Sequence, residues 1–224
     1  MPKRLPFFVM LFLAVAAFTA IAFTNGPHLT NWPINAKALA SYNQSTVKPL
    51  AQILKEKGLA NSGRGIKIVI DKSDHSLSIF SGNNWLKSYP VEFGEGGTGD
   101  KEVAGDRKTP EGTFYVTEKS VLNPADYYLG SRWLRLSYPN TEDADRGLLR
   151  GLINRWTRDQ VVAAIRSGTT PPQHTALGGG VGIHGGDKPE FGNSWTWGCI
   201  GLSNTDIEDF YNVINLGTPV IIKK

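Results

Sequence analysis

From Gly65 to the C-terminus, short β-type segments alternate with glycine- and proline-containing turns, and this pattern limits the fold more than any other feature. The segments "IKIVID" (66–71) and "SLSIF" (76–80) flank the polar turn "KSDH", which predicts a β-hairpin. Further strands are predicted at residues 86–93, 112–118 and 133–138, in "GGVGIHG" (179–185) and in "TPVIIK" (218–223).

Helices are expected at a few places between these strands. Residues 141–167 have a helical pattern, in which Thr157 and Gln160 fit a capping box and Gly168 ends the helix. Ser203 or Asn204 is expected to cap a last helix. The chain also contains 25 glycines and 13 prolines, which favours a turn-rich β fold over a helical bundle. These observations predict a mainly β fold with inserted helices, of the sandwich or barrel type.

The N-terminus has the pattern of an export signal. Lys3 and Arg4 precede an uncharged apolar run over residues 5–23, and small residues at Ala20–Ala22 suit a signal peptidase. The run is also almost long enough to span a bilayer, so an uncleaved anchor in contact with the membrane is the alternative. Residues 1–24 are therefore predicted to be a signal peptide or membrane anchor, and residues 25–64 a linker containing a short helix.

Two features argue against nucleotides and nucleic acids as ligands. The formal net charge is only +4 and there is no basic run, which suits a weakly anionic polymer better than nucleic acid. The glycine-rich segment 94–112 lacks the phosphate-binding pattern, because Asp100 follows Gly99 and neither Ser nor Thr follows Lys101. We interpret this segment as a connection between strands that borders a substrate cleft.

The stretch "IHGGDKPEFGNSWTWGCIGL" (183–202) contains the only cysteine of the chain, Cys199, and one of its four histidines, His184. A lone cysteine in an exported protein forms no intrachain disulfide, so it is a small buried residue, a partner in an intermolecular disulfide or a reactive thiol. Gly185 and Gly198 flank the pair and allow close backbone approach. Thiol catalysis needs a nucleophile, a base and a group that orients the base, and an imidazolium would lower the thiol pKa.

A metal site is not predicted. Zinc needs three or four Cys, His or carboxylate ligands, some of them close in sequence. His28, His75 and His174 are scattered, and only Asp187 lies near His184.

Several blocks in fixed order resemble the L,D-transpeptidase catalytic (YkuD-type) family of cell-envelope enzymes. The blocks are "IKIVIDKSDHSLSIF" (66–80), "GDRKTPEGTFYV" (105–116) and "IHGG…SWTWGCIGL" (183–202), followed by "NTDIEDFYNVINLGTPVIIK" (204–223). The resemblance identifies residues 65–224 as a catalytic domain of the L,D-transpeptidase type. Within the family, "WTxGC", "LSYPN" and "PPQHTALGGG" resemble one branch.

The resemblance also implies roles for individual residues. Cys199 corresponds to the nucleophile, which attacks the carbonyl of an L-centre residue in a peptidoglycan stem peptide and forms a thioester. His184 corresponds to the base, which the Gly185 carbonyl orients. Thr196 and Gly198 match positions beside the oxyanion site. The acyl group would pass from the thioester to an amine, which gives a crosslink or attaches a protein, or to water, which trims the stem peptide. The resemblance implies no metal or organic cofactor, because the thiol carries the chemistry.

Two positions depart from the common family motif. Trp197, expected beside the oxyanion and substrate site, replaces a histidine, and Gly201 replaces an arginine that suits acidic peptides. The cations Arg107, Arg132 and Arg135 are candidates to replace this arginine.

Aromatic residues near these motifs have two readings. Trp195 and Trp197 either pack within the loop or line the cleft, whereas Tyr127 and Tyr128 are expected at its edge.

The leading hypothesis is an exported peptidoglycan L,D-transpeptidase of the periplasm or cell envelope. The first alternative is a hydrolase of the same bonds, either an L,D-carboxypeptidase or an amidase that releases wall-attached protein. The second is a non-catalytic peptidoglycan-binding domain that has lost efficient chemistry.

Overall fold

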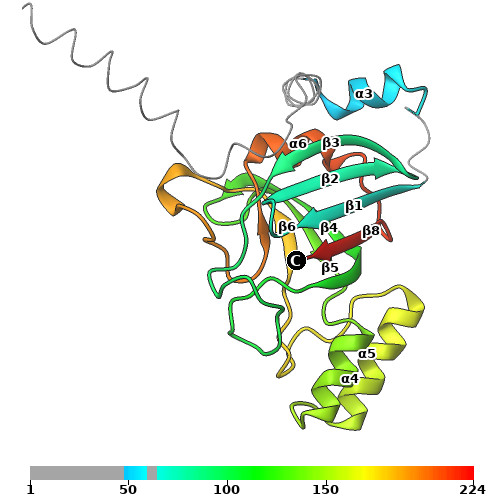
Figure 1. Cartoon of the computed structure of the whole chain (residues 1–224), viewed down its shortest axis with the longest axis vertical. Coiled ribbons are helices and arrows are strands. Elements are labelled where there is room, and N and C mark those ends of the chain that lie inside the picture. The colour runs from blue at the N-terminus through cyan, green and yellow to red at the C-terminus, as the bar shows by residue number, and fades with distance from the viewer. Residues whose placement is uncertain (1–47, 60–64) are drawn as a thin grey trace, which may run out of the picture. The chain divides into compact units, whose positions relative to one another are not determined.

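A computed structural model describes residues 48–59 and 65–224 (Figure 1). The predicted signal or anchor (1–24) and most of the predicted linker lie outside these residues. Within the described part, no helix is both long enough and apolar enough to cross a membrane.

In the described residues, eight strands form one sheet in the order β3-β2-β1-β8-β4-β5-β6-β7. Neighbouring strands are antiparallel except for the parallel pairs β1–β8 and β6–β7. The prediction of a mainly β fold with inserted helices is confirmed. The strands are β1 Ile66–Asp71, β2 Ser76–Ser81, β3 Asn84–Pro90, β4 Gly112–Asp126, β5 Gly130–Leu136, β6 Gly182–His184, β7 Ile200–Gly201 and β8 Pro219–Lys223.

The main core lies against one face of this sheet. In β1 every second residue, Ile66, Ile68 and Ile70, is buried, and Leu77 and Ile79 of β2 follow the same alternation. Successive side chains of a strand point to opposite faces, so this alternation places one apolar row on the core. The same core includes side chains from the other strands and from two helices.

The long strand β4 belongs to both halves of the sheet, and the two outer edges of the sheet are joined by backbone hydrogen bonds. Residues 112–115 of β4 pair with β8, whereas β4 pairs with β5 from Val116 onward. At the far ends, Glu92, which follows β3, exchanges two backbone hydrogen bonds of 2.9 Å with Gly201 of β7. This contact joins the segment after one edge strand to the opposite edge and fixes the position of β7.

Helices α3 (Leu50–Glu56) and α6 (Asn204–Tyr211) pack on the main core. Ser203 caps α6 through its side chain, which accepts from the Asp206 N–H, so the prediction of a cap here is confirmed. Asp209 of α6 connects three elements. Its carboxylate accepts from the Leu50 N–H at 2.9 Å, from Lys87 Nζ at 2.7 Å and from the Tyr89 hydroxyl at 2.8 Å.

Helices α4 (Thr141–Leu149) and α5 (Arg155–Ser167) form a hairpin between β5 and β6 and lie beyond the end of the sheet (Figure 1). The predicted cap of the second helix is wrong. Asn154 caps α5 by accepting from the Thr157 N–H, so Thr157 lies inside the first turn. Gly168 ends the helix in the left-handed conformation, as predicted. The hairpin has a small core of its own, formed by Ala144, Ile153, Val161 and Leu177.

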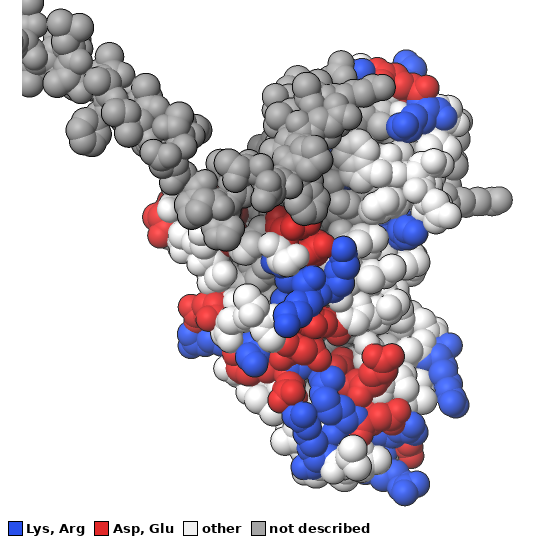
Figure 2. Space-filling model, viewed as in Figure 1, with Lys and Arg blue, Asp and Glu red and all other residues white. Residues whose placement is uncertain are grey.

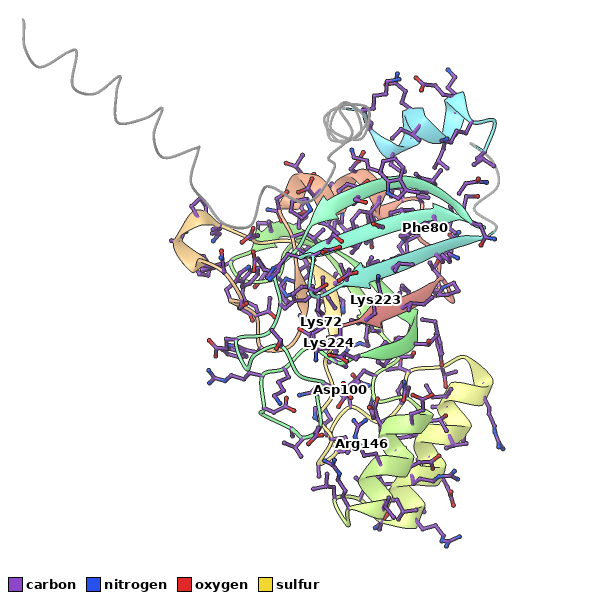
Figure 3. The ribbon with its side chains drawn as sticks, in the orientation of Figure 1. Lys72, Phe80, Asp100, Arg146, Lys223 and Lys224 are labelled. Carbon is purple, nitrogen blue, oxygen red and sulfur yellow. The ribbon has the colours of Figure 1, made fainter. Side chains whose placement is uncertain are left out.

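Arg146 of α4 connects this hairpin to the glycine-rich segment (Figure 3). Its guanidinium lies 3.2 Å from the Asp100 carboxylate and donates to the Lys101 carbonyl at 2.9 Å. On the face shown in Figure 2, acidic and basic side chains are interspersed around α4 and α5. Two of the pairs in this region are Arg150–Glu102 and Arg158–Asp145, each at 2.7 Å.

Candidate active site

Strand pairing brings Cys199 and His184 to neighbouring strands. In the parallel pair β6–β7, Ile183 lies opposite Ile200 and His184 opposite Gly201. Cys199 directly precedes β7 and is 9% exposed. Because side chains alternate along a strand, Cys199 lies on the same face as His184. Two residues that are 15 positions apart in sequence therefore lie on one face of the sheet, on neighbouring strands.

The hydrogen bonds of His184 define its tautomer. Nδ1 lies 2.7 Å from the Gly185 carbonyl oxygen, which only accepts hydrogen bonds, so Nδ1 carries the proton. Nε2 therefore keeps its lone pair, and it is buried without a hydrogen-bond partner among residues 48–59 and 65–224. A buried acceptor without a partner is costly in a folded protein and needs a functional or structural reason. This arrangement leaves the Nε2 lone pair able to accept a proton, although the thiol itself donates to the Gly180 carbonyl.

Burial keeps both members of the pair neutral. Burial lowers the pKa of His184 to about 4, against the hydrogen bond to Gly185 and the attraction of Asp126. Burial also raises the pKa of the Cys199 thiol to about 11. The resting pair is thus a neutral thiol and a neutral imidazole, rather than the thiolate stabilised by an imidazolium that the sequence suggested. Attack by the thiol then requires a proton acceptor in the same step.

The lowered pKa of His184 predicts a pH dependence of stability. Between pH 6.5 and about 4, the unfolded chain binds a proton at this histidine and the folded protein does not. The free energy of unfolding should therefore decrease as the pH falls through this interval. Urea unfolding at pH 7 and pH 4.5 measures the decrease, which should be smaller in His184→Gln. The exposed His174 provides the control variant, His174→Gln, which should behave as wild type. An equal decrease in all three proteins would contradict the prediction.

Internal hydrogen bonds shape the turn before Cys199. The buried Thr196 hydroxyl donates to the Cys199 carbonyl at 2.7 Å and accepts from the Gly198 N–H at 3.2 Å. Gly198 has a φ of 120°, and a Cβ there would lie 2.7 Å from the Lys108 carbonyl oxygen, so this position requires glycine. Thr196 therefore holds the turn together, and its hydroxyl is engaged within that turn.

A cavity of about 760 Å³ opens beside Cys199. The thiol lines it and lies 3.5 Å from the carbonyl oxygen of Gly180. Part of the glycine-rich segment also lines the cavity, so the prediction that this segment borders a cleft is confirmed. The charged residues of the lining are Lys101, Arg107, Glu118 and Arg135.

A family model, the L,D-transpeptidase catalytic domain (YkuD), matches residues 65–222, more than half of the chain. The chain belongs to this family. No curated protein matches it.

Three solved structures show how this L,D-transpeptidase-family chain compares. The helical cell shape determining protein Pgp2 from Campylobacter jejuni is 23% identical, with a TM-score of 0.48, over 71% of this chain and 47% of that one. Bd1075 from Bdellovibrio bacteriovorus is 22% identical, with a TM-score of 0.47, over 71% and 48%. An L,D-transpeptidase from Xylanimonas cellulosilytica is 17% identical, with a TM-score of 0.42, over 82% and 77%. The chain spans about half the length of the first two.

At Gly201, where the common L,D-transpeptidase motif has arginine, the space is filled by a tryptophan. A Cβ at Gly201 would lie 2.5 Å from the Trp195 ring and 3.0 Å from the Thr196 methyl group. Trp195 itself is 8% exposed. The absence of the motif arginine is therefore coupled to the packing of Trp195 against β7.

The other predicted site residues fall into different surroundings. Trp197 is exposed and lines the cavity. Its backbone N–H donates to the Tyr128 hydroxyl at 2.9 Å. Tyr128 also lines the cavity, and its ring lies 5.5 Å from that of His184. Burial raises the pKa of Tyr128 to about 12, so its hydroxyl stays protonated. Tyr127 is exposed and contacts Phe191 outside the cavity lining.

Sequence reasoning missed Lys101, Glu118 and Trp133 among the residues of the cavity. The run of glycines at 178–180, which also lines the cavity, was a usable signal, because three consecutive glycines leave space beside a strand. Of the three candidate cations, Arg107 and Arg135 line the cavity. Arg132 instead lies over the Tyr211 ring, 3.6 Å from the Glu208 carboxylate.

Proposed function

We propose that this protein is a cysteine acyltransferase that acts on peptidoglycan stem peptides at the cell envelope. One observation carries the proposal. Cys199 lines a cavity, and its side chain lies on the same face of the sheet as His184. In the described residues, His184 Nε2 has no hydrogen-bond partner, and Nδ1 donates to the Gly185 carbonyl. Membership of the L,D-transpeptidase family gives this thiol chemistry its substrate class.

The chemistry follows from the neutral pair. As Cys199 Sγ attacks the carbonyl carbon of the L-centre residue, His184 Nε2 takes the thiol proton. The tetrahedral intermediate then collapses with cleavage of the C–N bond, and His184 returns the proton to the leaving amine of the terminal D-residue. A thioester remains on Cys199. An incoming amine or a water molecule attacks it, giving transfer or hydrolysis respectively.

The backbone N–H groups next to Cys199 are candidates to stabilise the oxyanion of the tetrahedral intermediate, and both have hydrogen-bond partners in the resting protein. The Gly198 N–H donates to Thr196 and the Trp197 N–H donates to Tyr128. Because Tyr128 contributes only a hydroxyl from a neighbouring hairpin, its displacement would free the Trp197 N–H for the developing negative charge. We therefore place Trp197 and Tyr128 beside the oxyanion of the tetrahedral intermediate.

The proposed location at the envelope rests on the N-terminal pattern of basic and apolar residues. Export delivers the domain to the compartment where stem peptides occur, either as a released protein or held at the inner membrane. Fractionation of cells tests the location, and recovery of the protein in the cytosol with its N-terminus intact would contradict it.

The decisive experiment incubates the protein with purified muropeptides and identifies the products by mass spectrometry. Cleavage of the terminal D-residue with a new crosslink is expected for a transpeptidase, and cleavage without a crosslink for a hydrolase. Release of a wall-attached protein from intact sacculi would identify the amidase. Binding of muropeptides without any product would leave only the non-catalytic binding domain and would contradict the proposal.

A further inference from the structure

Arg135 occupies the same row of the sheet as the thiol. In the antiparallel pair β5–β6, Arg135 lies opposite Gly182, and Trp133 lies opposite His184. The β6–β7 register places Gly182 opposite Cys199, and the Gly182 backbone makes a hydrogen bond to the thiol. Residues directly opposite in a sheet point to the same face. The Arg135 and Cys199 side chains therefore emerge on one face, two strands or about 10 Å apart.

Gly182 lies between Arg135 and Cys199 in the sheet and has no side chain to separate them. A Cβ at Gly182 would lie 2.5 Å from the Trp133 ring, so the tryptophan occupies the space above the glycine. The Arg135 guanidinium lies 5.5 Å from this ring, and both residues line the cavity that contains Cys199. The cavity is thus bounded by a cation on one side and the nucleophile on the other.

The guanidinium is fixed but retains free donors. Arg135 Nε donates to the Glu118 carboxylate at 2.8 Å, and Nη1 donates to the Gln173 side-chain oxygen at 3.2 Å. A guanidinium has five N–H donors in one plane. Within the described residues these two bonds use two donors, which leaves three for a ligand. A planar group with adjacent donors suits a carboxylate.

The other cations of the cavity are less available. Lys101 is buried, and its Nζ lies 2.6 Å from the Asp106 carboxylate and 3.0 Å from the Val103 carbonyl oxygen. Arg107 forms an ion pair with Glu95, as Arg135 does with Glu118, but Arg107 is not among the charges that act on the Cys199 thiol. Burial dominates the raised pKa of Cys199, and the positive charges that oppose it belong to Arg135 and Lys101. Arg135 is therefore the cation that combines proximity to the thiol with unused donors.

We propose that Arg135 binds the terminal α-carboxylate of the D-residue released from the acyl donor, and so restricts the enzyme to bonds next to a free C-terminus. This inference rests on the proposed function. In the acyl donor that carboxylate lies only three bonds beyond the scissile carbonyl carbon, within about 4 Å by standard backbone dimensions. With the carbonyl at Sγ, the carboxylate lies in the cavity that Cys199 and Arg135 both line, on the side of the sheet from which the guanidinium emerges. Arg135 thus performs the carboxylate recognition that an arginine at position 201 offers in the common motif.

The test compares two stem peptides that differ only at the C-terminus, one with a free carboxylate and one with a primary amide. Wild type is expected to prefer the carboxylate by roughly 10- to 100-fold in kcat/KM, the scale of a charged hydrogen bond. In Arg135→Gln the ratio should approach one, whereas Arg135→Lys should retain part of the preference. The matched control is Arg132→Gln on the same strand, which should keep the wild-type ratio because Arg132 lies outside the cavity lining.

Each result supports or overturns the inference. An equal rate of wild type on both peptides overturns it, as does an unchanged preference in Arg135→Gln. If Arg135→Gln fails to fold, the wild-type ratio and the Arg135→Lys variant still decide. The absence of any Cys199-dependent product from either peptide is a different outcome, because it overturns the proposed function as well.

Discussion

The Cys199→Ala variant is expected to lose stem-peptide turnover by roughly 10⁴-fold or more, the scale on which removal of a covalent nucleophile acts. The chain contains no other cysteine, and the imidazole of His184 is fully buried and is not part of the cavity lining. Without Sγ there is no atom on which the acyl group can be held. Mass spectrometry of the intact protein after brief incubation with substrate should show the thioester adduct in wild type and none in the variant.

Alanine is a sound substitution here because it removes only the reacting atom. The side chain is nearly buried and accepts a hydrogen bond from the Gly182 backbone, so a small loss of stability is expected. Cys199→Ser is the matched control, since serine keeps a similar shape and a hydroxyl. It should also fail to turn over substrate at a useful rate, because the hydroxyl is harder to deprotonate by a base whose pKa is about 4. Wild-type turnover in Cys199→Ala would show that another group is the nucleophile.

The second large effect is expected for Gly201→Arg, which restores the residue of the common family motif. We expect a loss of about 3–5 kcal/mol in the free energy of unfolding, because the side chain overlaps a packed ring and places a charge in a buried position. In a protein of this size such a loss lowers Tm by about 10 °C. Thermal unfolding measures it, and the smaller Gly201→Ala should cost less.

A double variant separates the packing from the charge. Trp195→Ala removes the ring that the new side chain meets, at a cost of its own of about 3–5 kcal/mol. If the overlap is the cause, Gly201→Arg should cost less in the Trp195→Ala background than in wild type. A wild-type Tm for Gly201→Arg alone would show that the Trp195 ring moves aside easily. The packing of Trp195 would then not be the reason for glycine at this position.

The sequence predicted the strands well where one face is buried. The alternation of Ile66, Ile68 and Ile70 gives a clear period of two. The second half of β4 was missed, because beyond Val116 its side chains are exposed or half-buried and no apolar alternation marks the strand. The cap of α5 was misplaced by three residues, since both Asn154 and Thr157 are acceptable caps and tertiary packing decides between them.

The candidate site was predictable as far as Cys199 and His184, whose residue types and flanking glycines are visible in the sequence. The neutral state of the pair was not, because it depends on burial from all sides. Nor could Arg135 be separated from Arg132. The two lie three residues apart on one strand, and only the pairing of β5 with β6 determines which of them faces the thiol.

The tryptophans of the site have a practical consequence. Trp133 and Trp195 lie 5.9 and 5.4 Å from the His184 ring, and Trp197 lies 5.5 Å from Tyr128. These are three of the six tryptophans in the chain. Two of these three, Trp133 and Trp197, line the cavity, so part of the ultraviolet emission of the unlabelled protein reports on it. In a variant that cannot react, this emission lets a ligand be titrated into the cavity without any chemical step.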